Sequence, residues 1–342
     1  MDKQDIKDFT LKELGEAIVG IDEPIYRAKQ IFSWLYQKGI CSFKEMNNLP
    51  DKLIDKLGRH YYISSLNLCK QFKSKDGTEK FLFELSDGNF IETVLIYTKK
   101  RKTACLSTQV GCKFACSFCA SGRIGFVRNL TPSEITNQIL FLEHGLKHKI
   151  TNYVFMGMGE PLDNYENTSK ALLIMNDPKG LGIGARRITI SSCGIVPGID
   201  KLKDLGLKIN LSISLHAANN KLRSELVPIN KRYPLEELIE ACQRYIEKTE
   251  RAITLEYVLI KNKNHSLQDA AQLAAIAKRL RAKVNLIACS AVQGLNFSSP
   301  SLKDINIFMK DLVKRKVNVI LRKSKGADIQ AACGQLAGKE RC

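Results

Sequence analysis

The chain has 342 residues, of which 44% are hydrophobic and 26% are charged, proportions of an ordinary globular protein rather than a disordered one. Lys and Arg outnumber Asp and Glu by 53 to 35, and the net charge of +18 favours a polyanionic partner such as nucleic acid. No segment has the roughly 18 uninterrupted apolar residues of a membrane span, and the start, MDKQDIKDFT, has no apolar signal region. We therefore expect a cytoplasmic protein without membrane contact. The alternative interpretation of the net charge is a basic surface that only keeps the protein soluble.

The first hundred residues predict a helical part followed by a β-hairpin. Residues 1–75 are expected to be helical, because YRAKQIFSWLY and KEMNNLPDKLIDKL carry apolar side chains at the 3.6-residue period. Residues 76–102 contain strand-like runs at 80–85 and 89–98 on either side of the turn signal Ser86–Asp87–Gly88. This segment is expected to link the helical part to the rest of the chain.

Strands and amphipathic helices alternate from residue 103 to residue 325. Helices are expected at 164–177, 234–249 and 301–316, and two more begin at the capping sequences Thr131–Glu134 and Ser266–Asp269. Strands are expected at 103–108, 151–156, 186–192, 208–215, 252–260 and 283–289, and a seventh at 317–324 would close the series. This alternation predicts an α/β fold with a parallel sheet, either doubly wound or curled into a partial barrel. Residues 326–342, rich in Gly and Ala, predict a loop tail.

The cysteines carry the strongest chemical signal. Eleven cysteines in a chain without an export signal indicate metal or catalytic chemistry rather than a disulfide scaffold. Cys112, Cys116 and Cys119 lie in VGCKFACSFCASGRIG, and three thiolates on one loop can hold three irons of a [4Fe–4S] cluster. Zinc is the alternative, with Cys105 or a distant histidine as fourth ligand, although no second Cys-x2-Cys pair is present. Incidental buried cysteines are a third interpretation, which the tight spacing disfavours.

Polar residues follow several of the expected parallel strands. Gly157–Glu160 follows the second strand, Ser191 ends the third, Ser214–His216 end the fourth and Ser290 follows the sixth. Because ligands of parallel α/β folds bind at the carboxyl ends of the strands, we expect these residues to meet the cysteine loop at one rim. Taken singly, each also fits a structural role, such as a tight turn or a histidine satisfied in the core.

The combined motifs resemble a known family. Cys-x3-Cys-x2-Cys after the first strand of a (βα)6-type pattern is typical of the radical S-adenosylmethionine (SAM) superfamily. The sequences FMGMGEPL (155–162), ISLH (213–216), VPIN (227–230) and AACGQL (331–336) resemble the RNA adenine-C2 methyltransferases, which act on 23S ribosomal RNA and transfer RNAs. The resemblance covers about residues 25–338. It implies a partial (βα)6-type radical-SAM barrel at 103–325, a helical RNA-binding domain at 1–75, the hairpin linker at 76–102 and a tail at 326–342.

The resemblance also implies which residues bind the cofactors. Cys112, Cys116 and Cys119 would bind one [4Fe–4S] cluster. The residues that would contact SAM are Gly159, Glu160, Ser191, Ser214, Leu215, His216 and Ser290, with Glu160 pairing with the amino group of SAM. The chain departs from the family at Ser290–Ala291, where an Asn-Pro pair is usual. Serine keeps one donor and acceptor but has less reach, so weaker SAM binding or a bridging water is expected there.

The implied reaction uses two SAM molecules per turnover. The C2 carbon of adenine is weakly nucleophilic, so direct attack on the methyl group of SAM is implausible and a radical is required. One SAM would methylate Cys333, and a second, cleaved reductively, would give a 5′-deoxyadenosyl radical that takes hydrogen from the S-methyl group. The methylene radical would add to C2. Loss of the C2 proton to Glu92 or Cys105, and attack of Cys105 on the Cys333 sulfur, would release the base and leave a disulfide that the cytosol reopens.

The expected partners are 23S ribosomal RNA, transfer RNA and a flavodoxin-type electron donor, with the protein acting as a monomer. Arg27, Lys29 and Lys99–Lys102 are candidates for contacts to the RNA backbone. A relative that methylates adenine at C8 shares nearly all the motifs, and Pro161 favours the C2 branch. A zinc-stabilised RNA-binding protein without catalysis is the alternative from another class. A radical-SAM enzyme with a non-RNA substrate is disfavoured by the net charge of +18 and the AACGQL tail.

Overall fold

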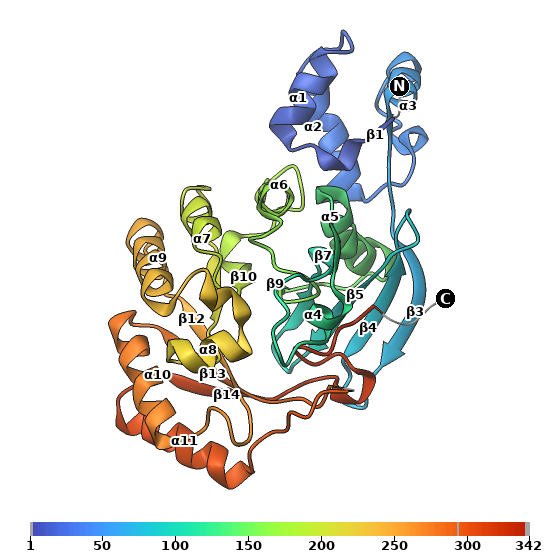
Figure 1. Cartoon of the computed structure of the whole chain (residues 1–342). Helices are drawn as coiled ribbons and strands as arrows, with labels where there is room; N and C mark the ends of the chain where they lie inside the picture. Colours follow the sequence, from blue (N-terminus) through green and yellow to red (C-terminus); the bar gives the residue numbers. More distant parts are fainter. Residues whose placement is uncertain (1–2, 293, 339–342) are drawn as a thin grey trace.

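One sheet of ten strands dominates the part of the chain that the computed structural model describes, residues 3–292 and 294–338 (Figure 1). Its order is β14-β13-β12-β11-β10-β9-β6-β5-β4-β3. The strands from β6 to β14 are parallel to one another, as the alternating pattern predicted. They are β6 (Lys102–Cys105), β9 (Asn152–Phe155), β10 (Ile188–Ser192), β11 (Asn210–Ser214), β12 (Thr254–Leu259), β13 (Lys283–Ala288) and β14 (Val319–Arg322).

Helices connect the parallel strands and cover the outer face of the sheet (Figure 1). The capping boxes at Thr131 and Ser266 open α5 and α10 as expected, since each side chain accepts the N3 backbone N–H. The strands and helices share one apolar core. The helices are α5 (Pro132–Leu140), α6 (Tyr165–Asn176), α7 (Val196–Lys203), α8 (Asn220–Leu226), α9 (Leu235–Thr249), α10 (Leu267–Arg279) and α11 (Leu302–Lys314).

The curled sheet does not close on itself. β14 and β3 stand at opposite ends of the strand order, and β14 pairs only with β13 among the described strands. The predicted partial barrel is therefore confirmed. Because the barrel stays open, its interior is not filled entirely by apolar side chains, and inward positions of neighbouring strands carry polar groups such as Ser212, Glu256 and Asn285.

Three antiparallel strands extend the sheet beyond β6. The predicted hairpin is present as β4 (Glu79–Glu84) and β5 (Phe90–Tyr97). β3 (Asn67–Lys73) pairs with β4 at the outer edge, so the expectation of helix was wrong for these residues. In NLCKQFK, Leu68 and Phe72 alternate with exposed polar residues, and partial burial of these apolar side chains beside β4 stabilises a strand.

Residues 3–62 form a separate lobe of helices, drawn in blue in Figure 1. Its core includes Leu140 of α5 and Ile174 of α6, so the lobe is packed onto the barrel helices. The buried Lys7 Nζ donates to Asn137 Oδ1 at 3.0 Å across the same boundary. The elements are β1 (Gln4–Asp5), η1 (Ile6–Asp8), α1 (Leu11–Val19), α2 (Tyr26–Ser33), η2 (Trp34–Lys38), η3 (Phe43–Glu45), α3 (Asp51–His60) and β2 (Tyr61–Tyr62).

A small hairpin that the sequence pattern did not reveal carries the cysteine loop. β7 (Gln109–Gly111) pairs with β8 (Phe126–Asn129), and α4 (Ala120–Ile124) lies between them. A Cβ at Gly111 would lie 1.7 Å from the carbonyl oxygen of Gly125, so this pairing requires glycine. The remaining short turns are η4 (Phe141–Gly145), η5 (Ala185–Arg187), η6 (Pro228–Lys231) and η7 (Ala327–Ile329). In the described residues, no helix is long and apolar enough to cross a membrane.

Candidate active site

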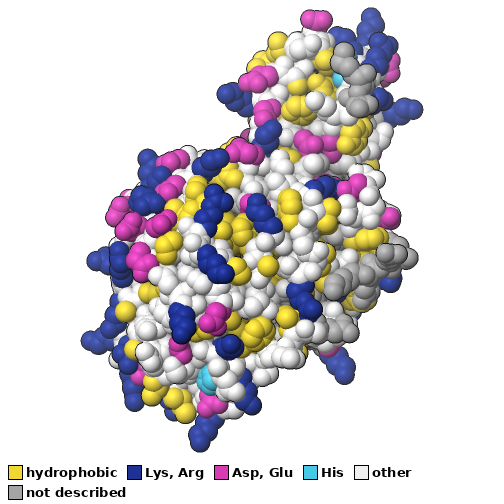
Figure 2. Space-filling view, in the orientation of Figure 1, with side chains coloured by type: hydrophobic (Ala, Val, Ile, Leu, Met, Phe, Trp, Pro, Cys, Tyr) yellow, Lys and Arg dark blue, Asp and Glu magenta, His cyan; other side chains and the backbone are white. Residues whose placement is uncertain are grey.

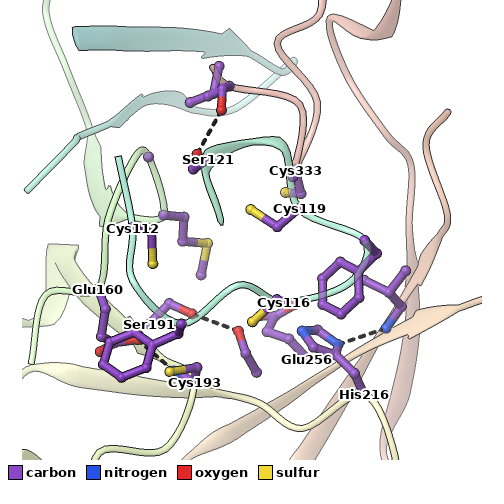
Figure 3. A pocket seen from close by; sticks show the side chains of 18 of the residues that line it. Cys112, Cys116, Cys119, Ser121, Glu160, Ser191, Cys193, His216, Glu256 and Cys333 are labelled. Atoms are coloured by element: carbon purple, nitrogen blue, oxygen red, sulfur yellow. Dashed lines mark hydrogen bonds between the residues drawn. The ribbon is translucent and has the colours of Figure 1, made fainter. Parts of the chain in front are cut away.

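A cavity of about 160 Å³ lies at the carboxyl ends of the parallel strands (Figure 3). Cys112, Cys116 and Cys119 face it together, which is the convergence that the sequence predicted. The cavity is also lined by Gly157, Gly159 and Glu160 after β9, Ser191 of β10, and Ser214 and His216 at the end of β11. Residues from these four segments of the chain therefore share one rim.

The three cysteine side chains can each bind one iron of a cubane cluster. Burial raises the pKa of Cys112 to about 12 and that of Cys116 well above its usual range, so these thiols need bound metal to ionise. Among the described residues, no three His, Cys, Asp or Glu side chains converge as a single metal ion requires. In a cubane each thiolate binds a different iron, so no such convergence is needed.

The Gly-Met-Gly-Glu turn after β9 brings backbone close to the cavity. Gly159 has a φ of +95°, and a Cβ there would lie 2.5 Å from Cβ of Gln109, so only glycine fits. Glu160, which is 4% exposed, accepts the N–H of Cys193 at 2.7 Å and that of Leu162 at 3.1 Å. Burial raises the pKa of Glu160. Each carboxylate oxygen keeps a lone pair that can accept from an ammonium group in the cavity.

His216 is held as a neutral imidazole beside the cysteine loop. Its Nδ1 accepts the N–H of Val258 at 3.1 Å, and burial lowers its pKa to about 3, with the charge of Arg223 adding to the effect. The Phe118 ring packs edge-on against it, with centroids 4.7 Å apart. Nδ1 is therefore an acceptor, the proton resides on Nε2, and that N–H can donate to a ligand.

Two of the expected SAM contacts lie elsewhere. The Leu215 side chain is buried in the core, and its backbone N–H donates to the Glu256 carbonyl at 3.0 Å. Ser290 is not among the described residues that line the cavity, and its Oγ lies 3.5 Å from Ser324 Oγ. Ser191 and Ser214 do face the cavity, with their hydroxyl oxygens 3.5 Å apart (Figure 3).

The tail places Cys333 next to the cysteine loop. The N–H of Ala120 donates to Gly334 O at 2.7 Å, and Ser121 Oγ donates to Leu336 O at 2.7 Å (Figure 3). Cys333 consequently lines the cavity although it is 214 residues from Cys119 in sequence. Cys105, on β6, is close enough for the charge of Cys333 to add to the burial that raises its pKa to about 12.

Cys105 and Cys333 are both free thiols in this structure. The disulfide that the resemblance implies between them is therefore not supported here.

Glu92 lies behind the tail rather than in the cavity. The carboxylate is 3% exposed, and its Oε1 lies 2.8 Å from Lys80 Nζ. Its Oε2 accepts the N–H groups of Ala337 at 2.7 Å and Gly338 at 3.1 Å. In this arrangement Glu92 fixes the segment that follows Cys333.

Sequence reasoning missed four polar residues that line the cavity, namely Ser121, Cys193, Glu256 and Arg322. Arg322 ends β14, and its pKa is raised first by the charge of Cys333 and then by Glu256 and Cys105. Arg322 is therefore close to Cys105, Cys333 and Glu256. The available signal was an arginine at the end of the last expected strand of the series.

Comparison with known protein families agrees with this site. Residues 106–274 match the family model of the radical SAM superfamily, and residues 4–63 match the ribosomal RNA large subunit methyltransferase N-terminal domain. A crystal structure of a radical SAM methyltransferase from Sphaerobacter thermophilus superposes with a TM-score of 0.92 at 42% identity, covering 98% of this chain and all of that one. The fold and the site thus define a radical SAM methyltransferase.

Two curated relatives narrow the family. Both are named probable dual-specificity RNA methyltransferase RlmN, one from Clostridium novyi and one from Acholeplasma laidlawii. The first is 44% identical over 334 residues, which is 97% of each chain. The second is 45% identical over 331 residues, 97% of this chain and 98% of the relative. The chain therefore belongs to the dual-specificity RNA methyltransferase family of radical SAM enzymes.

Proposed function

We propose that the protein methylates C2 of adenine in 23S ribosomal RNA and in transfer RNA, with two SAM molecules consumed per turnover. The observation that carries the proposal is the position of Cys333, which the Ala120–Gly334 and Ser121–Leu336 hydrogen bonds hold beside the cysteine loop. A cysteine bordering both the cluster site and the barrel interior can accept a methyl group on one side and present it to a base on the other. Family membership supplies the RNA substrate class.

The rim residues would hold SAM in a fixed orientation. Cys112, Cys116 and Cys119 would bind the cluster, which with SAM supplies the radical when both are bound. Glu160 would accept the ammonium group of SAM, and Gly159 would let backbone approach it. Ser191, Ser214 and the protonated Nε2 of His216 would offer further hydrogen bonds. The cavity wall contains Phe114, Phe118 and Phe155, which limit water near the reacting atoms.

The steps after radical formation would each use a different residue, namely Cys333, Cys105 or Glu92. Cys333 carries the methyl group, and Cys105 attacks the Cys333 sulfur to release the product. The raised pKa of Cys105 means that it is a thiol at neutral pH, so it needs a proton acceptor before it can attack. The family role of Glu92 is to take the C2 proton. Because its oxygens hold Lys80, Ala337 and Gly338, that role requires movement of the tail.

The proposal also covers the location of the protein in the cell, its oligomeric state, its electron donor and its domains. We place the enzyme in the cytoplasm as a monomer with a flavodoxin-type electron donor. We also keep the division into residues 1–75, 76–102, 103–325 and 326–342, except that β3, within the first range, pairs with β4 and belongs to the sheet. The helical lobe before β3 is proposed as the RNA-binding domain. On the face shown in Figure 2, Lys and Arg side chains are spread over both lobes with acidic side chains among them, which suits general attraction of RNA.

Mass spectrometry of nucleosides tests the function. Ribosomal and transfer RNA would be incubated anaerobically with the reconstituted protein, a reductant and SAM, with Cys333→Ala beside it and Cys41→Ala as an exposed-cysteine control. We expect 2-methyladenosine from the wild type and Cys41→Ala, and none from Cys333→Ala. 8-Methyladenosine would place the enzyme in the C8 branch. No methylated adenosine with an intact cluster would contradict the proposal.

A further inference from the structure

A second and larger cavity opens inside the barrel, on the side where the parallel strands begin. Its volume is about 740 Å³, within the usual range for binding sites of small molecules. Its wall includes Thr103, Asn152, Asn210, Thr254 and Lys283, which lie at the first or second positions of five strands of the sheet. The cavity therefore lies at the opposite end of the barrel from the cysteine loop.

The two cavities meet at one set of side chains. Both are lined by Met156, Glu256, Ile287, Arg322 and Cys333. SAM would have to occupy the first cavity to reach the cysteine loop. A substrate that reacts at Cys333 must therefore approach from the other side of this set, which is the second cavity.

Positive charge dominates the wall of the second cavity. Its only acidic lining residue among those described is Glu256. Its basic lining residues are Arg101, Arg251, Lys283, Arg322, Lys323 and Lys325. Such a wall attracts an anion. A nucleotide, with a flat base and a phosphate at each end of the sugar, matches both the volume and the charge.

Glu256 has an unused acceptor at the point where the cavities meet. The residue is 4% exposed, and its Oε1 accepts from Asn285 Nδ2 at 3.0 Å. Its Oε2 is buried and has no hydrogen-bond partner among the described residues. Burial raises the pKa of Glu256, and Arg322, Asn285 and Ser212 offset only part of that rise. A buried carboxylate oxygen without a donor indicates a ligand that brings an N–H or O–H group.

We propose that the target adenine enters through the basic cavity, and that Glu256 Oε2 accepts a hydrogen bond from its 6-amino group while C2 faces Cys333. The 6-amino group is the only N–H donor on the base of an adenosine in RNA, and C2 belongs to the same six-membered ring. Met156 and Ile287 supply apolar surface for the ring. Guanine would present a carbonyl oxygen to the carboxylate, so Glu256 rejects it. This inference rests on the proposed function.

An analogue without the amino group tests the contact. An RNA hairpin carrying either adenosine or purine riboside at the target would be given to the wild type, to Glu256→Gln, and to Glu247→Gln as an exposed-carboxylate control. We expect purine to lower kcat/KM of the wild type and of Glu247→Gln about 10- to 100-fold, as loss of a charged hydrogen bond does. Glu256→Gln should react with the two RNAs within about threefold of each other.

Two further measurements separate the outcomes. The affinity of Glu256→Gln for SAM, and its cluster absorbance, should match the wild type. If SAM affinity falls and purine discrimination persists, Glu256 contacts the SAM ribose and the inference is wrong. It is equally wrong if the wild type does not discriminate against purine. Absence of any methyladenosine from wild type would instead overturn the proposed function.

The entry route has its own test. Arg101→Ala and Lys323→Ala should each raise the KM for the RNA roughly 3- to 10-fold and reduce its salt dependence, because each removes one cation from the cavity wall. Lys314→Ala, on the exposed side of α11, is the matched control and should change neither. Equal KM values for all three variants and the wild type would contradict entry through this cavity.

Discussion

The cavity at the strand ends and the cavity at the strand starts share five wall residues, yet the rest of each wall differs in chemistry. Cysteines, three phenylalanines and a glycine turn form most of the first, whereas basic and amide or hydroxyl side chains form the second. The first suits a cluster and a cofactor that must be kept from water, and the second suits a charged, hydrated RNA nucleotide. One partial barrel can thus bring two reactants to Cys333 from opposite ends.

Loss of one cluster ligand should have the largest effect on methylation and should leave RNA binding at the other cavity intact. Cys116→Ser removes a thiolate that the cluster requires, so methylation should fall by more than the roughly 100-fold that changing an outer-shell partner costs. Iron content and cluster absorbance should fall with it. RNA affinity should stay near the wild-type value, because the second cavity contains none of the three cysteines. A parallel loss of RNA affinity would show that the two ends are not separate.

The buried ion pair between Lys80 and Glu92 holds the tail segment that follows Cys333. Lys80→Met leaves the buried Glu92 carboxylate without its cation, so the free energy of unfolding should fall by about 3–5 kcal/mol. Chemical denaturation would measure this, with the exposed Lys52→Met as control. A loss below about 1 kcal/mol would mean that Glu92 is not a charged anchor for the tail.

Substitution of Glu160 should have a smaller effect that is confined to SAM binding. Glu160→Gln keeps the shape of the side chain but removes the charge expected to meet the SAM ammonium group. The SAM concentration at half-maximal rate should rise about 10- to 100-fold. The KM for RNA should not change, because Glu160 lines only the first cavity. If the KM for RNA rose instead, Glu160 would belong to the substrate side.

The smallest expected effect concerns neither cavity. Thr131 caps α5 by accepting the Glu134 N–H at 3.2 Å, and Thr131→Ala should lower the free energy of unfolding by about 1 kcal/mol. The KM values for SAM and RNA should stay unchanged, which gives a baseline for the variants above. A change in either KM would show that ordinary loss of stability disturbs the cavities.

The first cavity could be predicted from the sequence and the second could not. Cys112, Glu160, Ser191 and His216 follow strands in the chain, and the common direction of parallel strands brings such residues together. Glu256 and Arg322 lie within strands, where sequence pattern does not tell which face a side chain takes. Only the opening of the barrel between β14 and β3 leaves room for polar side chains inside it.

A position at or after the end of a strand did not by itself predict that a residue lines the first cavity. Ser290 follows β13, but the described structure turns it towards Ser324 rather than into the first cavity. Glu92 is buried in β5, and its contacts to the tail join residues 245 and 246 positions apart in the chain. Contacts of that range leave no periodic signal in the sequence.

The most direct test of the whole account is whether RNA becomes covalently attached to Cys333. Release of the product requires attack by Cys105 on the Cys333 sulfur, so Cys105→Ala should stop after the carbon bond to C2 has formed. Denaturing electrophoresis of the Cys105→Ala reaction should show a protein band that RNase shortens, and peptide mass spectrometry should place the nucleotide on Cys333. An intact cluster and SAM cleavage without any adduct, or an adduct on another residue, would contradict the account.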